Sequence, residues 1–244
     1  MRPRRVGLST AAALLALGVL GLATLRHTRT TPGPPPAGPA SSEATSVDAG
    51  TSSLPSGSPT PVAALDDLRW VEFHGVRVPV SASAGPRENP LVGAPSGFAD
   101  TPTGALMAAV HIALRLDDRF GPKVFEPTVQ QRVTGPDTAA ALAALEQQYE
   151  QDRVQAGAPD GEATGPVYVD LVGFRADGFT PAAVVVHLLA RGGTAAPSGA
   201  GYADYRVDLR WVGGDWWMLA PPAGSWDSLV TIAASPVGYT QFGR

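Results

Sequence analysis

Hydrophobic residues follow three different patterns along this chain. Residues 6–25 form a run of 20 residues without a charged side chain, and about 20 apolar residues are what a helix needs to cross a bilayer. From Leu106 to Tyr149, apolar residues return at intervals of three and four, which predicts amphipathic helices. From Val167 onward they alternate with polar residues, which predicts strands with one buried and one exposed face. The chain is therefore expected to contain a transmembrane helix, then helices, then a sheet.

The charges around the uncharged run predict its orientation. Arg2, Arg4 and Arg5 precede the run, and basic residues beside a membrane span mark its cytoplasmic side. The run is longer than the apolar part of a secretory signal peptide and ends without a clean small-x-small cleavage site. We therefore favour a retained signal anchor through residues 6–25 over a cleaved signal peptide. The protein is then a single-pass cell-membrane protein with a cytoplasmic N-terminus and an extracellular C-terminal domain.

The segment after the anchor has the composition of a spacer. Residues 30–61 contain eight prolines, twelve serines or threonines and four glycines, too little apolar surface to fold alone. The segment is either a tether that lifts the domain away from the membrane or a disordered stretch without a length requirement. We expect an N-terminus and anchor at 1–29, a linker at 30–64, short strands and a long loop at 65–100, the main domain at 101–222 and a tail at 223–244.

Start and stop signals predict the first helix. Thr101 suits the N-cap and Pro102 the first helical position, and the helix is expected to run to about Arg119. Its apolar face is broad, and His111 and Arg115 are expected on a narrow, half-exposed polar stripe. This placement favours His111 as a polar neighbour of Arg115 over a role as a catalytic base.

Other elements flank this helix. A second helix is predicted at about 136–155, with Gly157 as its stop signal. Before the first helix, residues 68–80 are rich in aromatic and β-branched side chains and predict one or two short strands. Between them, residues 81–100 are dense in Gly, Pro, Ser and Asn and form a long loop, expected to lie over the domain. A binding role for this loop stays open.

Four strands are expected after Gly165, with the clearest alternation at residues 205–211. A turn at Asp177-Gly178 is expected to join the first two strands, and Gly213-Gly214 to join the last two, because glycine tolerates positive φ at both positions of a tight turn. Counting outward from Gly213-Gly214 pairs Trp211 with Trp216, Leu209 with Met218 and Arg210 with Trp217.

Composition narrows the class of protein. With 44% hydrophobic and 16% charged residues, the chain is typical of a globular domain. The absence of cysteine means that no disulfide supports an exported domain. From Glu43 onward 22 acidic residues face 13 basic ones, a formal charge of −9, which argues against a surface that binds nucleic acid.

The predicted order of elements is two helices followed by four strands, and the last two strands lie at residues 207–217, Val-Asp-Leu-Arg-Trp-Val-Gly-Gly-Asp-Trp-Trp. This order resembles the NTF2-like fold. This resemblance implies an α+β cone in which helices pack on a curved four-stranded antiparallel sheet. The order of anchor, spacer and outer domain is similar to the VirB8/TcpC type, the membrane-anchored components of conjugative DNA-transfer machines. Residues 85–105 also resemble uncharacterised exported proteins of actinobacterial integrative conjugative elements. The long loop at 81–100 departs from the VirB8/TcpC pattern.

Asp170, His187 and Asp208 are the candidate catalytic residues if the chain is an enzyme, since NTF2-like domains include isomerases and dehydratases that use an Asp or an Asp/His pair. A turn at Asp177-Gly178 places Asp170 almost opposite His187, and a carboxylate that holds an imidazole can make a general base. The favoured interpretation is a polar pair on the outer side of the sheet. No cofactor or metal is predicted, because the four histidines are scattered at 27, 74, 111 and 187.

Three function classes follow from these observations. The favoured one is a non-enzymatic, membrane-anchored assembly component of a cell-envelope machine, which the resemblance identifies with conjugative DNA transfer. Its expected partners are envelope-complex proteins or further copies of the chain, and not nucleic acid. The alternatives are a small-ligand or cell-wall binding module and an isomerase or dehydratase. An open pocket lined by Asp170 and His187 favours an enzyme, whereas an interior filled by its own side chains favours the assembly component.

The anchor predicts the topology of the mature protein. Protease added to intact protoplasts is expected to degrade the domain after Thr30, because this part lies outside the membrane. Immunodetection of the N- and C-terminal ends checks this. An exported protein whose own sequence starts near Thr24 would instead show cleavage, and a protected domain would reverse the orientation.

Overall fold

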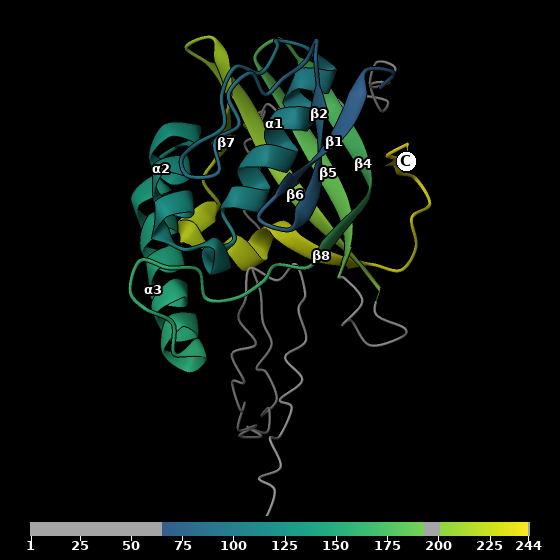
Figure 1. Cartoon of the computed structure of the whole chain (residues 1–244). Helices are drawn as coiled ribbons and strands as arrows, with labels where there is room; N and C mark the ends of the chain where they lie inside the picture. The colour runs from purple at the N-terminus through teal and green to yellow at the C-terminus, as the bar shows by residue number, and fades with distance from the viewer. Residues whose placement is uncertain (1–64, 193–200, 244) are drawn as a thin grey trace, which may run out of the picture. The chain divides into compact units, whose positions relative to one another are not determined.

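The computed structural model describes residues 65–192 and 201–243 (Figure 1). The predicted anchor and the linker through residue 64 lie outside this part of the chain. Within it, no helix combines the length and apolar character that a membrane crossing requires. The anchor therefore stays a prediction from the sequence.

Helices and strands both contribute to the described part. The helices are α1 (Pro102–Arg115), α2 (Pro122–Arg132) and α3 (Thr138–Ala156), with short 3-10 turns η1 (Asp118–Phe120), η2 (Pro222–Gly224) and η3 (Trp226–Leu229). The strands are β1 (Leu68–Phe73), β2 (Val76–Ser81), β3 (Val133–Thr134), β4 (Val169–Thr180), β5 (Ala183–Gly192), β6 (Tyr202–Val212), β7 (Asp215–Leu219), β8 (Val230–Ala233) and β9 (Thr240–Gln241).

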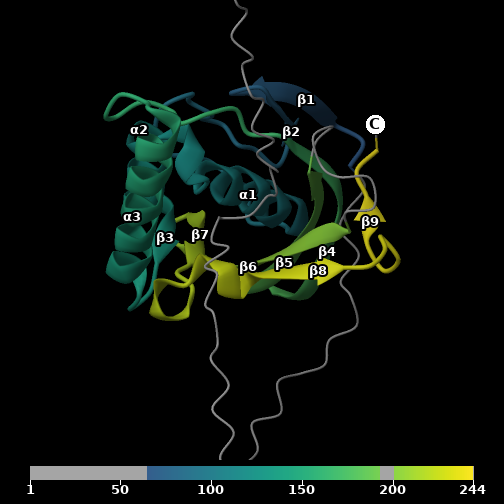
Figure 2. The same cartoon turned by 90° about the horizontal axis from the view of Figure 1, so that it is seen from below.

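Two sheets enclose α1. The main sheet has seven strands in the order β3-β7-β6-β5-β4-β9, and β8 pairs with β6. Strands β1 and β2 form a separate two-stranded antiparallel hairpin. Seen from below, α1 lies between this hairpin and the main sheet, with α2 and α3 to one side (Figure 2).

The predicted NTF2-like cone with a four-stranded antiparallel sheet was wrong. The main sheet has seven strands of mixed orientation, because β3 runs parallel to β7. The strands that the prediction missed, β3, β8 and β9, are two to four residues long. Such short segments contain too little alternation to be recognised from sequence, and they pair only where the rest of the fold brings them beside a long strand.

The N-terminus of α1 forms as its sequence predicts. The Thr101 hydroxyl accepts a hydrogen bond from the Gly104 amide at 3.0 Å, and Pro102 occupies the first turn, where its missing N–H costs nothing. A side chain at Gly104 would bring its Cβ to 2.0 Å from the Ala99 carbonyl oxygen, so the loop approaches this closely only because residue 104 is glycine. The helix ends at Arg115, four residues before the predicted end.

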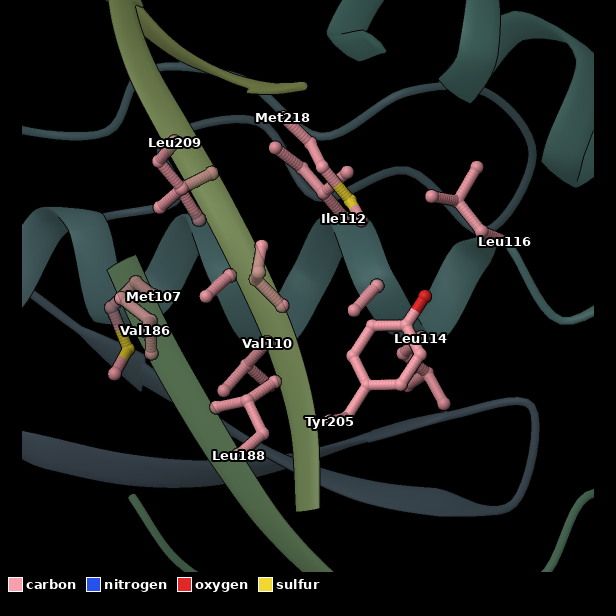
Figure 3. Packing of buried hydrophobic residues seen from close by; sticks show 14 of the residues in the cluster. Met107, Val110, Ile112, Leu114, Leu116, Val186, Leu188, Tyr205, Leu209 and Met218 are labelled. Carbon is pink, nitrogen blue, oxygen red and sulfur yellow. The ribbon is translucent and has the colours of Figure 1, made fainter. Parts of the chain in front are cut away.

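The core lies on both sides of α1. On the sheet side, α1 packs Met107, Val110 and Leu114 against buried residues of β5, β6 and β7 (Figure 3). Those residues, all less than 6% exposed, are Val186, Leu188, Tyr205, Leu209 and Met218. On the other side, Phe73, Val76 and Val78 of the hairpin close over the helix. The interior is therefore filled by the protein's own side chains.

The hairpin of β6 and β7 has the predicted register. Trp211 pairs with Trp216, Leu209 with Met218 and Arg210 with Trp217. Gly213 and Gly214 adopt φ angles of +59° and +86°, as a tight turn of this type requires. The prediction is confirmed because one face of the hairpin is buried and a slip of one residue would expose it.

The long loop at residues 82–100 is fastened to the sheet through one carboxylate. Asp215, at the start of β7, accepts hydrogen bonds from the amides of Gly97 at 2.9 Å and Phe98 at 3.1 Å. Arg132 pairs with the same carboxylate at 3.2 Å and also donates to the Pro95 carbonyl. The loop therefore lies over the domain, as predicted.

Adjacent residues of β6 are expected to differ sharply in their contribution to stability. Leu209 is 1% exposed and Arg210 points outward. Leu209→Ala is expected to lower the free energy of unfolding by about 2 to 5 kcal/mol, and Arg210→Ala by less than about 1 kcal/mol. Denaturant unfolding of the two variants measures both values. Equal losses would contradict the assigned faces of β6.

Candidate functional site

Polar side chains gather on the outer face of the main sheet, the face away from α1. We call this group the outer-face cluster, and it consists of Arg175, Asp177, His187, Asp204, Arg206, Asp208 and Tyr239. The strands bring most of the cluster together by register: Arg175 of β4 lies opposite His187 of β5, which lies opposite Arg206 of β6. Tyr239 comes from the segment that leads to β9.

His187 lies at the centre of this cluster between two carboxylates. Its Nδ1 is 3.0 Å from both oxygens of Asp204, and its Nε2 is 3.7 Å from Asp177. The Asp204 contact fixes the ring, since a carboxylate accepts from an Nδ1–H and leaves Nε2 as the second nitrogen. The imidazole is therefore held in one orientation, with Nδ1 on Asp204 and Nε2 on the side of Asp177.

Of the predicted trio, His187 and Asp208 both belong to the outer-face cluster, whereas Asp170 does not. Asp170 lies opposite Arg191 and accepts a hydrogen bond from its guanidinium at 2.9 Å. Asp208 pairs with Arg206 at 2.8 Å on its own strand. The carboxylate that holds His187 is Asp204, which the sequence placed on the exposed face but did not single out.

A misplaced turn explains the wrong partner. Asp177-Gly178 was expected to be the turn, but β4 continues through both residues to Thr180, and Gly178 takes a φ of +64° at an irregularity in the strand. The chain turns at Pro181 instead, where the Thr180 hydroxyl bonds the Ala183 amide at 3.0 Å. The Thr-Pro pair was the signal for this turn.

Tyr239 closes one side of the outer-face cluster. The Arg175 guanidinium lies 5.5 Å from its ring centre. Burial, together with a hydrogen bond to Asp204, raises the pKa of the Tyr239 hydroxyl to about 12. The hydroxyl therefore stays protonated at neutral pH and helps to hold the carboxylate that orients His187.

The cluster lacks other parts of a catalytic site. The hydrogen bonds and ion pairs of His187 within the described residues go to Asp204 and Asp177, and neither is a hydroxyl or thiol nucleophile. No group of three His, Asp or Glu side chains in the described ranges could hold a metal ion. The ion pairs Arg175–Asp177 and Arg206–Asp208 balance two of the three carboxylates of the cluster, and the third, Asp204, contacts His187.

His111 and Arg115 of α1 form a second polar group, which was expected to be half-exposed and is fully buried. The His111 Nε2 lies 2.8 Å from the Pro79 carbonyl oxygen, so this nitrogen donates and Nδ1 is the acceptor that faces Arg115 Nη1 at 3.3 Å. Burial and the Arg115 charge lower the pKa of His111 to about 3. His111 is thus a neutral, structural histidine.

Three carboxylates lie close together where the segment after α1 meets α3. Asp117 and Asp118 belong to that segment, and Asp152 belongs to α3. Arg119 binds Asp117 through its Nε at 2.8 Å and its Nη2 at 2.6 Å. Burial, then the charges of Asp117 and Asp152, raise the pKa of Asp118 to about 7. Asp118 is thus partly protonated near neutral pH, because burial and the neighbouring carboxylates disfavour its charged form.

An apolar cavity lies between the C-terminal part of α1 and the sheet. Its volume is about 30 Å³, and Val110, Leu114, Leu188 and Tyr205 are among the residues that line it. Ligand sites for small molecules are usually about 300 to 1,000 Å³. This interior cavity is therefore far too small for a substrate of ordinary size. Two larger clefts are more open: one of about 160 Å³ is lined by Trp70, Arg77 and Asp170, and one of about 380 Å³ by Arg191, Tyr202 and Phe242.

A family model described as "Domain of unknown function (DUF8175)" matches residues 29–241. The chain belongs to the DUF8175 family. Neither a curated protein nor a solved structure matches it. The DUF8175 match spans the predicted linker as well as the folded domain.

Two buried groups of this DUF8175 domain are expected to oppose each other in the pH dependence of stability. The lowered pKa of His111 means that stability falls as the pH drops from about 6.5 towards 3, because only the unfolded chain takes up the proton. The raised pKa of Asp118 means that stability falls as the pH rises from about 4 to 7, because in this range the unfolded chain releases the proton that the folded chain still holds.

Asp118→Asn separates these two effects. Relative to this variant, the wild type is expected to lose free energy of unfolding as the pH rises from 4 to 7, by up to about 1.4 kcal/mol per pH unit. Denaturant unfolding of both proteins between pH 4 and 8 measures the difference. Parallel pH profiles would show that Asp118 ionises in the folded state as it does in the unfolded chain.

Proposed function

We propose that this protein is a membrane-tethered, extracytoplasmic assembly component that works by binding other proteins and not by turnover. The observation that carries the proposal is the filled interior between α1 and the main sheet. Leu114, Leu188 and Tyr205 meet there and leave a cavity of about 30 Å³, so the interior of the domain, where an NTF2-like enzyme would bind its substrate, has no room for one.

The arrangement of the candidate catalytic residues supports the same proposal. Asp170 and His187 belong to different contacts, with Arg191 and Asp204 respectively. In the outer-face cluster, the described polar contacts of His187 are with the carboxylates of Asp204 and Asp177, and none is with a serine, threonine or cysteine. A sheet face with paired charges of both signs suits a surface that meets another protein, where complementary charges select the partner.

The cellular location of the domain and the kind of machine to which we assign it are inferred from the sequence. The uncharged run at residues 6–25 and the arginines before it support tethering with the domain outside the cell. The formal charge of −9 from Glu43 onward favours a protein partner over DNA. The resemblance to VirB8/TcpC proteins identifies the machine that we propose as a conjugative DNA-transfer complex.

A tethered domain does not need tight binding. Anchoring to the same membrane as its partners raises their effective concentration, so that several individually weak contacts hold an assembly together. The linker predicted from the composition of residues 30–64 is expected to give the domain the reach to make these contacts.

Gene deletion and rescue test the proposal. Deleting the gene from its mobile element is expected to reduce transfer frequency, and the wild-type gene is expected to restore it. The double variant Asp170→Asn/His187→Gln is also expected to restore transfer, since a binding role requires no proton transfer at His187. Unchanged transfer after deletion would reject the conjugative role. Failure of a stably folded double variant that still associates with the envelope complex would favour an enzyme.

A further inference from the structure

A cleft of about 380 Å³ lies where the C-terminal segment, residues 239–243, runs beside β4 (Figure 2). Its walls come from Val172 of β4, Arg191 of β5, Tyr202 of β6 and residues 241–243. Small-molecule sites usually have volumes of about 300 to 1,000 Å³, so this cleft is large enough for a ligand, unlike the interior cavity. We call it the edge cleft.

One wall of the edge cleft is shaped by a bulge in β4. The pairing register of β4 with β5 shifts between Leu171 and Gly173, so Val172 has no partner on β5, and bulges of this kind re-aim a side chain at a sheet edge. The Phe242 amide donates to the Val172 carbonyl at 3.3 Å. At Gly173 a Cβ would lie 2.8 Å from the Thr240 carbonyl oxygen, so glycine permits this close approach of the C-terminal segment.

The opposite wall, the C-terminal segment, is held at both of its ends. Phe242 is buried, and the centre of its ring lies 5.0 Å from that of Phe174 and 5.8 Å from that of Trp70. The Trp70 indole N–H donates to the Gly243 carbonyl at 3.3 Å. At the other end, Tyr239 belongs to the outer-face cluster. The walls of the edge cleft are therefore fixed by the fold, and a ligand does not have to order them.

Polar side chains of the lining have hydrogen-bonding capacity that the domain does not use. The half-exposed Arg191 guanidinium donates to Asp170 at 2.9 Å, which leaves most of its N–H donors available. Within the described residues, neither the Tyr202 hydroxyl nor the Gln241 side-chain amide has a hydrogen-bonding partner. Donors therefore outnumber acceptors in the edge cleft, and this favours a ligand rich in acceptor oxygens.

The charge of the lining favours a carboxylate among such ligands. Arg191 is the one charged side chain in the lining of the edge cleft, and a guanidinium can bind a carboxylate through two parallel hydrogen bonds. A phosphate monoester carries a charge of about −1.5 to −2 at neutral pH, more than one guanidinium shared with Asp170 can balance. Val172, Phe242 and the ring of Tyr202 contribute apolar surface, which suits an organic body attached to the carboxylate.

We propose that the edge cleft binds a small organic monocarboxylate, which is either a free acid or the carboxyl end of a peptide. Arg191 binds the carboxylate, the Tyr202 hydroxyl and the Gln241 amide donate further hydrogen bonds, and Val172 contacts the apolar body. This inference goes beyond the proposed assembly role and does not rest on it, because the cleft belongs to the fold of the single domain.

An NMR titration of the full-length chain in detergent micelles tests the proposal. The indole N–H signal of Trp70, assigned with Trp70→Phe, reports on the edge cleft because this group bonds to Gly243 in its wall. Benzoate is the probe, and benzamide is its uncharged counterpart of nearly the same shape. We expect benzoate to shift the signal in a saturable manner. Benzamide is expected to bind about tenfold or more weakly, because it offers no charge to Arg191.

Three variants locate the binding. Arg191→Gln is expected to lower the affinity for benzoate by about tenfold or more, and Tyr202→Phe, which removes only a hydroxyl, by several-fold. Arg210→Gln makes the same change at an exposed arginine near the other end of β6 and is expected to leave the affinity unchanged. A wild-type Trp70 signal in each ligand-free variant shows that the cleft is intact.

The absence of a saturable shift, equal affinities for benzoate and benzamide, or an affinity that Arg191→Gln does not change would each overturn the proposal. An unchanged affinity in Tyr202→Phe would overturn the role of this hydroxyl.

A second pair of probes separates the two sources of the carboxylate. N-acetyl-L-phenylalanine imitates the carboxyl end of a peptide, and N-acetyl-L-phenylalaninamide is its uncharged counterpart. Tighter binding of N-acetyl-L-phenylalanine than of benzoate would identify a peptide end as the ligand, and the reverse order would identify a free acid. Either result supports a carboxylate site, provided that Arg191→Gln weakens the binding and the amide binds more weakly than the acid.

Discussion

Helix α1 is buried from Thr103 to Arg115, so it needs protein on every side, and most of the architecture serves to supply it. A helix that is apolar all round cannot lie on the surface of a sheet with one face in water. The main sheet covers one side of α1, and the hairpin of β1 and β2 covers the other (Figure 2). The hairpin is thus the second wall of the core and not an accessory.

Because α1 is completely buried, its polar side chains must find hydrogen-bonding partners inside the protein. His111 and Arg115 need hydrogen-bonding partners, since buried polar groups without partners are costly. His111 donates to the Pro79 carbonyl of β2, and Arg115 reaches Asn89 and Pro90 of the loop. One turn of helix therefore connects the hairpin and the loop to the centre of the molecule.

Asp215 makes the corresponding connection from the sheet. Its carboxylate accepts from the amides of Gly97, Phe98 and Trp216 and pairs with Arg132 of α2. Loop, sheet and helix meet at this single side chain. The long loop is consequently a structured part of the domain, and the exposed side chains that it presents have defined positions. A protein that works by contact gains from such a surface, because little freedom is lost on binding.

The sequence alone determined the features that depend on neighbouring residues. Thr101 and Pro102 began α1, Gly157 ended α3 in the left-handed conformation, and Gly213-Gly214 set the register of β6 and β7. Each of these features follows from local backbone geometry, which neighbouring residues determine. The uncharged run at 6–25 belongs to the same class of signal, and its role as an anchor stays a prediction.

Tertiary structure decided the rest. Whether His111 was exposed depended on the hairpin that covers it, and the partner of His187 depended on a turn at Pro181 and on a bulged strand. The two-residue strands β3 and β9 exist only because longer strands lie beside them. These features could not be predicted from the sequence, because each depends on contacts between segments far apart in the chain, whose energies local patterns do not contain.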